Sequence, residues 1–123
     1  MPRDPIRHPG DDRIRALHIL EAAREALRFC DGRTRADLDR DGLLRRAVLH
    51  CLQEIGEAAS KMSTPTRERL PDVPWVQMVG MRHRLVHVYW VINLDLVWTV
   101  VTDELRPLIE ALESALREWP SAE

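Results

Sequence analysis

Hydrophobic positions recur every three or four residues along most of the chain, the spacing that places side chains on one face of an α-helix. The first such stripe consists of Ile14, Leu17, Leu20, Ala23 and Leu27. The second and most regular consists of Leu44, Val48, Cys51, Ile55, Ala59 and Met62. The third consists of Leu94, Val97, Val101, Leu105, Leu108, Leu112 and Leu116. Each stripe predicts an amphipathic helix with one buried face.

Polar residues and glycine mark the ends of the first two helices. Asp11 or Asp12 can cap a helix that runs to about Phe29, and Gly32 follows as a stop signal. Residues 34–37, Thr-Arg-Ala-Asp, fit a capping box that opens a short helical turn. Asp41 is then placed to cap the long helix that ends near Met62.

Prolines divide the second half of the chain. Residues 63–66 break the long helix, and a short turn to Leu70 is expected. Pro74 suits the first residue of another helix, which we expect to continue to about Trp90.

The last helix begins at Asn93 or Asp95, which can serve as its cap, and Pro107 should kink or divide it near Asp103. Residues 97–102 are rich in β-branched side chains, but the apolar spacing on both sides is helical. No run alternates as a strand would. The pattern therefore predicts an all-α bundle of four or five antiparallel helices over residues 11–119, preceded by a loose arm at residues 1–10.

Composition fits one globular domain. The chain has 123 residues, a net charge of −2, 45% hydrophobic residues and 31% charged residues. It has no apolar run long enough to span a membrane, and its N-terminus lacks the apolar core of a signal peptide. Cys30 and Cys51 lie in helical patterns, as buried reduced thiols of a cytoplasmic protein would. Seventeen arginines accompany a single lysine, Lys61. This excess of arginine suits phosphate binding, but coding bias in the genome explains it equally well.

Residues 81–90 concentrate the groups that can do chemistry. This stretch holds two arginines, two histidines, a tryptophan and the only tyrosine of the chain. On a helical wheel Tyr89 lies within about 20° of Arg82, while His83 and His87 lie at roughly 100° and 140°. The opposite half carries the apolar side chains of Met81, Leu85, Val88 and Ile92. The polar half also holds Val79, Val86 and Trp90, which favours a cleft or a subunit interface over free solvent.

The order Arg82, four residues, His87, one residue, Tyr89 resembles the signature of HepT-type proteins of the HEPN superfamily. Further stretches resemble the same family: residues 53–59, with Ile-Gly-Glu-Ala; residues 73–75 and 78–82, which lead into the signature; and residues 94–98. The resemblance covers about residues 12–116. His83 stands where asparagine is commonest, and Val91 and Ile92 stand where a glycine-containing turn is usual.

This resemblance implies a fold, an activity and partners. It implies a homodimeric HEPN bundle that pools the signature of both protomers and acts as the ribonuclease toxin of a type II or type VII-like toxin–antitoxin pair. It also implies an antitoxin of the MNT type, a minimal nucleotidyltransferase that silences the toxin by transferring AMP to Tyr89.

The residue types fit metal-independent RNA cleavage, in which the 2′-hydroxyl of the substrate is the nucleophile. Histidine exchanges protons near neutral pH, so His87 is the candidate general acid or base. Arg82 can stabilise charge on the phosphate, and His83 can assist or orient His87. No cofactor is expected.

Two alternatives remain open at this point, and a third is argued against by the residues present. The catalytically inactive alternative is a HEPN subunit that only docks a nucleotidyltransferase. His83 and His87 have the spacing of a zinc-binding pair, but Arg84 stands where a metalloprotease needs its glutamate, so no metal site is predicted. His87 and Tyr89 can also be structural residues.

Overall fold

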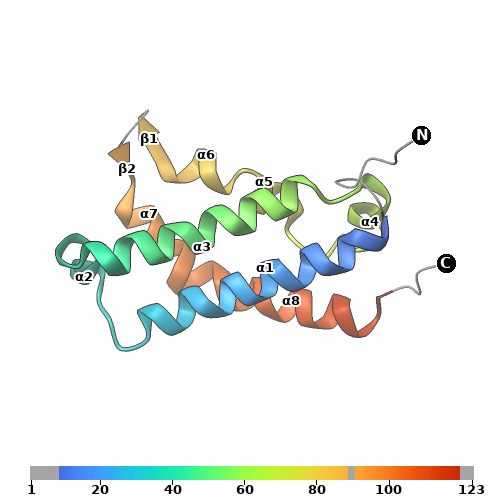
Figure 1. Cartoon of the computed structure of the whole chain (residues 1–123), viewed down its shortest axis with the longest axis horizontal. Coiled ribbons are helices and arrows are strands. Elements are labelled where there is room, and N and C mark those ends of the chain that lie inside the picture. Colours follow the sequence, from blue (N-terminus) through green and yellow to red (C-terminus); the bar gives the residue numbers. More distant parts are fainter. Residues whose placement is uncertain (1–8, 89–90, 120–123) are drawn as a thin grey trace.

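Three long helical segments build the bundle in the computed structural model, which describes residues 9–88 and 91–119 (Figure 1). Helix α1 spans Pro9–Cys30, and α3 spans Gly42–Ser60. The third segment comprises α7 (Leu94–Thr99), a π-helical turn at Val100–Glu104 and α8 (Leu105–Arg117). Figure 1 shows α1 antiparallel to both α3 and α8, which lie along two of its sides. The predicted all-α fold is therefore confirmed.

The stripe predicted for the second helix forms the centre of the core. All six of its members are buried: Leu44, Val48, Cys51, Ile55, Ala59 and Met62. They pack against buried side chains of α1 and of the third segment, among them Ile19, Val97, Leu105 and Leu112. This helix is predictable because it buries a single, regular face.

The face predicted for α1 is partly wrong. Leu20 and Ala23 are buried as expected, but Ile14 and Leu17 are 52% and 37% exposed. Small residues occupy the contact instead, since Ala16, Ala22 and Ala26 are buried. Because α1 contacts its neighbours through alanines, its buried face differs from the one that its large hydrophobic residues indicate.

Helix α1 also begins earlier than predicted, at Pro9, so Asp12 is not its cap. The carboxylate of Asp12 is fully buried and accepts hydrogen bonds from the hydroxyls of Ser63 and Thr66, at 2.5 Å each. It also accepts from the Ser63 backbone N–H at 3.3 Å. Asp12 therefore fastens the start of α4 (Thr64–Arg69), whose cap is Ser63, to α1.

The predicted starts of α2 and α3 are confirmed. The Asp41 carboxylate accepts from the Leu44 backbone N–H at 3.0 Å and begins α3. Helix α2 (Arg35–Arg40) opens with the predicted capping box, in which Asp37 accepts from the Thr34 N–H at 2.7 Å. Gly32 takes a positive φ of 71° just after α1, a backbone conformation that favours glycine.

The single helix predicted from Pro74 to Trp90 is wrong. The chain forms two short helices, α5 (Trp75–Val79) and α6 (Met81–Leu85), with Gly80 between them. It then becomes extended as β1 (Val86–Val88), which pairs antiparallel with β2 (Val91–Ile92), placing Val86 opposite Ile92. β-Branched residues favour extended backbone, and the Asn93 N–H closes the ribbon by donating to the Leu85 carbonyl at 2.7 Å. Trp90, the predicted helix end, lies outside the described residues.

The division predicted near Asp103 is present as the π-helical turn. Asn93 caps α7 by accepting from the Leu96 N–H at 3.0 Å, and the turn closes with the Leu105 N–H bonded to the Val100 carbonyl. Pro107 has no N–H to offer the carbonyl four residues before it, which is that of Asp103. The helical interpretation of residues 97–102 is confirmed.

Within the described ranges, no helix is both long and apolar enough to cross a lipid bilayer.

Candidate active site

Helix α6 presents two of the predicted site residues to solvent. Met81 and Leu85 are buried in the core, while Arg82 and His83 are exposed. Within the part of the chain that the structure describes, neither Arg82 nor His83 forms an ion pair or a side-chain hydrogen bond. Both are therefore available to a ligand, on the side of α6 that the hydrophobic pattern predicted.

The strand changes how the remaining signature residues relate to Arg82. His87 lies in β1, so the helical-wheel angle that placed it on the same half-helix as Arg82 does not apply. The two residues are joined by the end of α6 at Leu85 and by the start of the strand at Val86. Tyr89 lies outside the described residues.

Gly56 lets α6 lie close to α3. A Cβ built on Gly56 would stand 3.1 Å from the Met78 carbonyl oxygen, 3.4 Å from the Met81 Cβ and 3.8 Å from the Arg82 nitrogen. A side chain at this position would push away the junction between α5 and α6. Gly56 therefore sets the position of the backbone that carries Arg82.

Arg84 is directed away from the exposed pair. Its guanidinium makes two hydrogen bonds to the Glu104 carboxylate, Nη1 to Oε1 at 3.0 Å and Nη2 to Oε2 at 2.9 Å. These bonds raise the pKa of Arg84 above its ordinary value. The pair links α6 to the π-helical turn.

A second ion-pair group fixes the segment that follows the β-ribbon. Arg35 of α2 donates to Asp95 in the first turn of α7 and to Asp39, both at 2.8 Å. The hydrogen bond to Asp95 raises the pKa of Arg35. A shallow hollow of about 440 Å³ lies beside this group, and its wall includes Val91 and Ile92 of β2. Ion pairs thus fix the segments that precede and follow the ribbon in the sequence.

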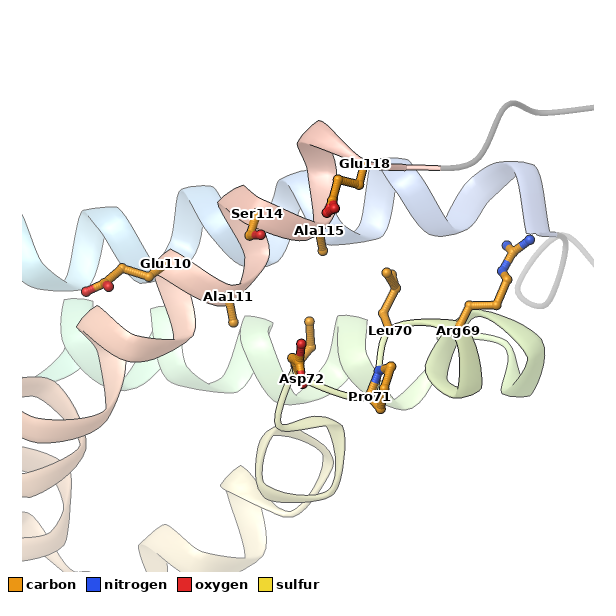
Figure 2. Close-up of a pocket in the computed structure, with 10 residues that line it drawn as sticks. Arg69, Leu70, Pro71, Asp72, Glu110, Ala111, Ser114, Ala115 and Glu118 are labelled. Carbon is orange, nitrogen blue, oxygen red and sulfur yellow. The ribbon is translucent and has the colours of Figure 1, made fainter.

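A larger cavity, of about 610 Å³, lies elsewhere in the bundle. Figure 2 shows it between the loop that follows α4 and one face of α8. Its wall combines acidic Asp72, Glu110 and Glu118 with apolar groups such as Leu70 and Ala111. None of the signature residues lines it, and we assign it no role in the chemistry of α6.

No group of three or more His, Cys, Asp or Glu side chains arranged to hold a metal ion is found within residues 9–88 and 91–119.

Comparison with known proteins identifies the family to which the chain belongs. A family model described as "Ribonuclease HepT-like" matches residues 19–115, most of the chain. The chain belongs to the Ribonuclease HepT-like family. The resemblance drawn from the signature and its flanking segments is therefore confirmed.

Several relatives of this HepT-like chain carry names. "Putative RNase MJ1380" of Methanocaldococcus jannaschii is 33% identical over 95 residues, which cover 77% of this chain and 87% of the relative. "Putative RNase TTE0752" of Caldanaerobacter subterraneus is 30% identical, with 82% and 90% covered. "Probable ribonuclease HepT" of Thermococcus cleftensis is 29% identical, with 72% and 84% covered. No solved structure matches the chain significantly.

Sequence reasoning missed two residues that organise the site of this HepT-like chain. Gly56 left a signal, because glycine inside a helix costs about 1 kcal/mol relative to alanine and usually has a packing reason. Glu104 left none, since it lies 20 residues after Arg84 and its orientation depends on the π-helical turn.

Proposed function

We propose that this chain is a metal-independent endoribonuclease. The observation that carries the proposal is the exposure of Arg82 and His83 on a helix whose other face is buried, in a chain of the Ribonuclease HepT-like family. The names of its relatives support the same substrate class.

In the proposed reaction, the 2′-hydroxyl of RNA attacks the adjacent phosphorus. A general base takes the hydroxyl proton, and a general acid protonates the departing 5′-oxygen, so the products carry a 2′,3′-cyclic phosphate and a 5′-hydroxyl. His87 serves as the general acid or base, and His83 supports it. Arg82 neutralises the charge that accumulates on the phosphate oxygens in the transition state.

The site is proposed to be completed by a second copy of the chain. Val76 and Val79 of α5 lie just before Arg82 in the sequence, and they are 85% and 36% exposed. Apolar side chains beside a polar site favour a protein interface over free solvent. In the homodimer, each protomer would contribute its signature to a composite active site.

Regulation is proposed to act on Tyr89. An MNT-type nucleotidyltransferase would transfer AMP to the tyrosine hydroxyl, and the anionic adduct would occupy the phosphate site and repel RNA. The protein would thus be the toxin of a toxin–antitoxin pair.

Intact-mass analysis tests this regulation after incubation with ATP and an MNT-type nucleotidyltransferase. We expect AMP-sized additions on the wild type and none on Tyr89→Phe. Additions that persist on Tyr89→Phe would place the modification on another residue.

The activity itself is tested by expression in a bacterial host. Wild-type protein should stop growth and cleave RNA, whereas Arg82→Ala should do neither while accumulating to the same level. Growth that is unaffected by the wild type, together with stable binding of the nucleotidyltransferase, would instead support the inactive docking subunit.

A further inference from the structure

We infer that the ion pair between Arg84 and Glu104 holds α6 in its working orientation, which makes both of them positioning residues for Arg82 and His83. The consequence for cleavage rests on the proposed ribonuclease function. The two hydrogen bonds run in parallel, at 3.0 and 2.9 Å, from one guanidinium to one carboxylate. Such bidentate pairing fixes the angle between the two groups as well as their distance.

Helix α6 cannot keep its shape without such contacts. It has only five residues, little more than one turn, and helices of this length are unstable in isolation because nucleation is costly. Its first turn is set by the close approach to Gly56 and by the burial of Met81. At its other end Leu85 is buried, and Arg84 supplies the side-chain hydrogen bonds to the third helical segment.

The partner of Arg84 stands at an irregular point of that segment. Glu104 is the last residue of the π-helical turn, whose hydrogen bond spans one residue more than that of an α-helix. The extra residue changes the face on which the following side chains lie. Glu104 lies where this face changes and points toward α6. The π-helical turn therefore places the Glu104 carboxylate within reach of Arg84.

The pair also separates Arg84 from its neighbours in the signature. Arg82 and His83 are exposed, whereas Arg84 is half-buried and engaged by Glu104. A released Arg84 guanidinium would be a second phosphate-binding fork two residues from Arg82. Pairing therefore keeps one arginine of α6 for structure and leaves the other for RNA.

The test compares Glu104→Gln with a matched control, Glu113→Gln. Glu113 pairs with Arg24 between α8 and α1, at a distance of 2.5 Å, and neither residue belongs to the site. A third protein reverses the pair, with Arg84→Glu and Glu104→Arg together. Thermal unfolding followed by circular dichroism first establishes that each variant folds.

Two measurements are then made on each full-length protein. Amide hydrogen exchange of residues 81–86 reports local opening of α6 and needs no enzymatic activity. Cleavage of an RNA oligonucleotide separates kcat from KM, which distinguishes a misplaced group from weaker binding.

In Glu104→Gln, the amide hydrogens of α6 should exchange several-fold faster than in the wild type, and those of the other helices should not. The kcat of this variant should fall about tenfold to a hundredfold, with KM nearly unchanged. Glu113→Gln should behave as wild type in both measurements, and the reversed pair should recover slow exchange and part of kcat. Unchanged exchange at α6 in Glu104→Gln, or equal effects of the two single variants, would overturn the inference. If the wild type cleaves no RNA, the proposed function fails, and hydrogen exchange alone decides whether the pair holds α6.

Discussion

Three consecutive residues of α6, Arg82, His83 and Arg84, have cationic or titratable side chains, and the fold places these side chains in different environments. Arg82 and His83 are exposed, and Arg84 is bound to Glu104. The exposure of the first two was predictable, because Met81 and Leu85 mark the buried face on either side. The engagement of Arg84 was not, because its partner is distant in the sequence.

Replacing Arg82 should affect chemistry far more than stability. We expect Arg82→Ala to lower the rate of RNA cleavage by about a hundredfold or more, since electrostatic stabilisation of the transition state is the largest catalytic contribution of such a group. Its free energy of unfolding should change by less than about 0.5 kcal/mol, because the side chain is exposed. Single-turnover cleavage and urea unfolding measure the two effects.

Arg117→Ala is the matched control for that experiment, since Arg117 is also exposed but lies at the end of α8. It should leave both quantities unchanged. A similar loss of cleavage in both variants would mean that general positive charge, rather than Arg82, drives the reaction.

The buried cysteine at the centre of the core gives a pH-dependent prediction. Burial, with a smaller contribution from Glu25, raises the pKa of Cys51 to about 11 from an ordinary 9.0. Unfolding therefore favours the thiolate, so the stabilising effect of the neutral thiol is complete below pH 9 and is lost as the pH rises toward 11.

We expect the difference in free energy of unfolding between wild type and Cys51→Ala to be constant up to about pH 9 and to shrink above it. Urea unfolding at pH 7, 8, 9 and 10.5 measures this difference. A difference independent of pH over that range would contradict the assignment of a shifted thiol.

At the scale of elements, the helices that were predicted correctly are those with strong local signals. Asp41 caps α3, Asp37 completes the capping box of α2, and Asn93 caps α7, each through bonds within three residues. The β-ribbon escaped prediction because its strands are only three and two residues long. Val88 and Ile92 also continue the helical spacing of Met81 and Leu85, so periodicity alone extended the helix too far.

The close packing of α5 and α6 on α3 leaves little space for a side chain at Gly56. Alanine is about 1 kcal/mol better than glycine inside a helix, so Gly56→Ala would be stabilising if space were available. The Met78 carbonyl, 3.1 Å from the added Cβ, belongs to the backbone and cannot rotate away. We therefore expect Gly56→Ala to lower the free energy of unfolding by about 1 kcal/mol or more and to reduce cleavage.

Gly42→Ala serves as the control in the same helix. Its added Cβ would meet only the Arg45 side chain, at 3.4 Å, which can move. It should be neutral or slightly stabilising and fully active. Gly56→Ala with wild-type stability and activity would show that α6 tolerates displacement.

At the scale of the whole molecule, local periodicity predicts the bundle but not the site. The core joins three long segments, of which the second and third bury the stripes that periodicity predicts, whereas alanines form much of the contact of α1. The site depends on the ribbon and on an ion pair between distant residues. The proposed dimer would also bring residues of a second copy to the site, and the periodicity of one chain does not predict that contact.

The proposed dimer predicts that apolar residues beside the candidate site matter for assembly. Val79→Glu should shift sedimentation toward the monomer and reduce cleavage at low protein concentration, because a charge would be buried in the interface. Leu43→Glu is the control, since Leu43 is 81% exposed at the start of α3. Both variants should unfold as the wild type does; an unaltered dimer in Val79→Glu would place the interface elsewhere.

The measurement closest to the central claim is RNA cleavage by the purified protein in excess EDTA, with the protein first shown by mass to be unmodified. His87→Ala is assayed alongside. The proposed function predicts cleavage that persists in EDTA, leaves a 2′,3′-cyclic phosphate and disappears in His87→Ala. Cleavage that EDTA abolishes, or that is equal in the two proteins, would contradict a metal-independent reaction at this site.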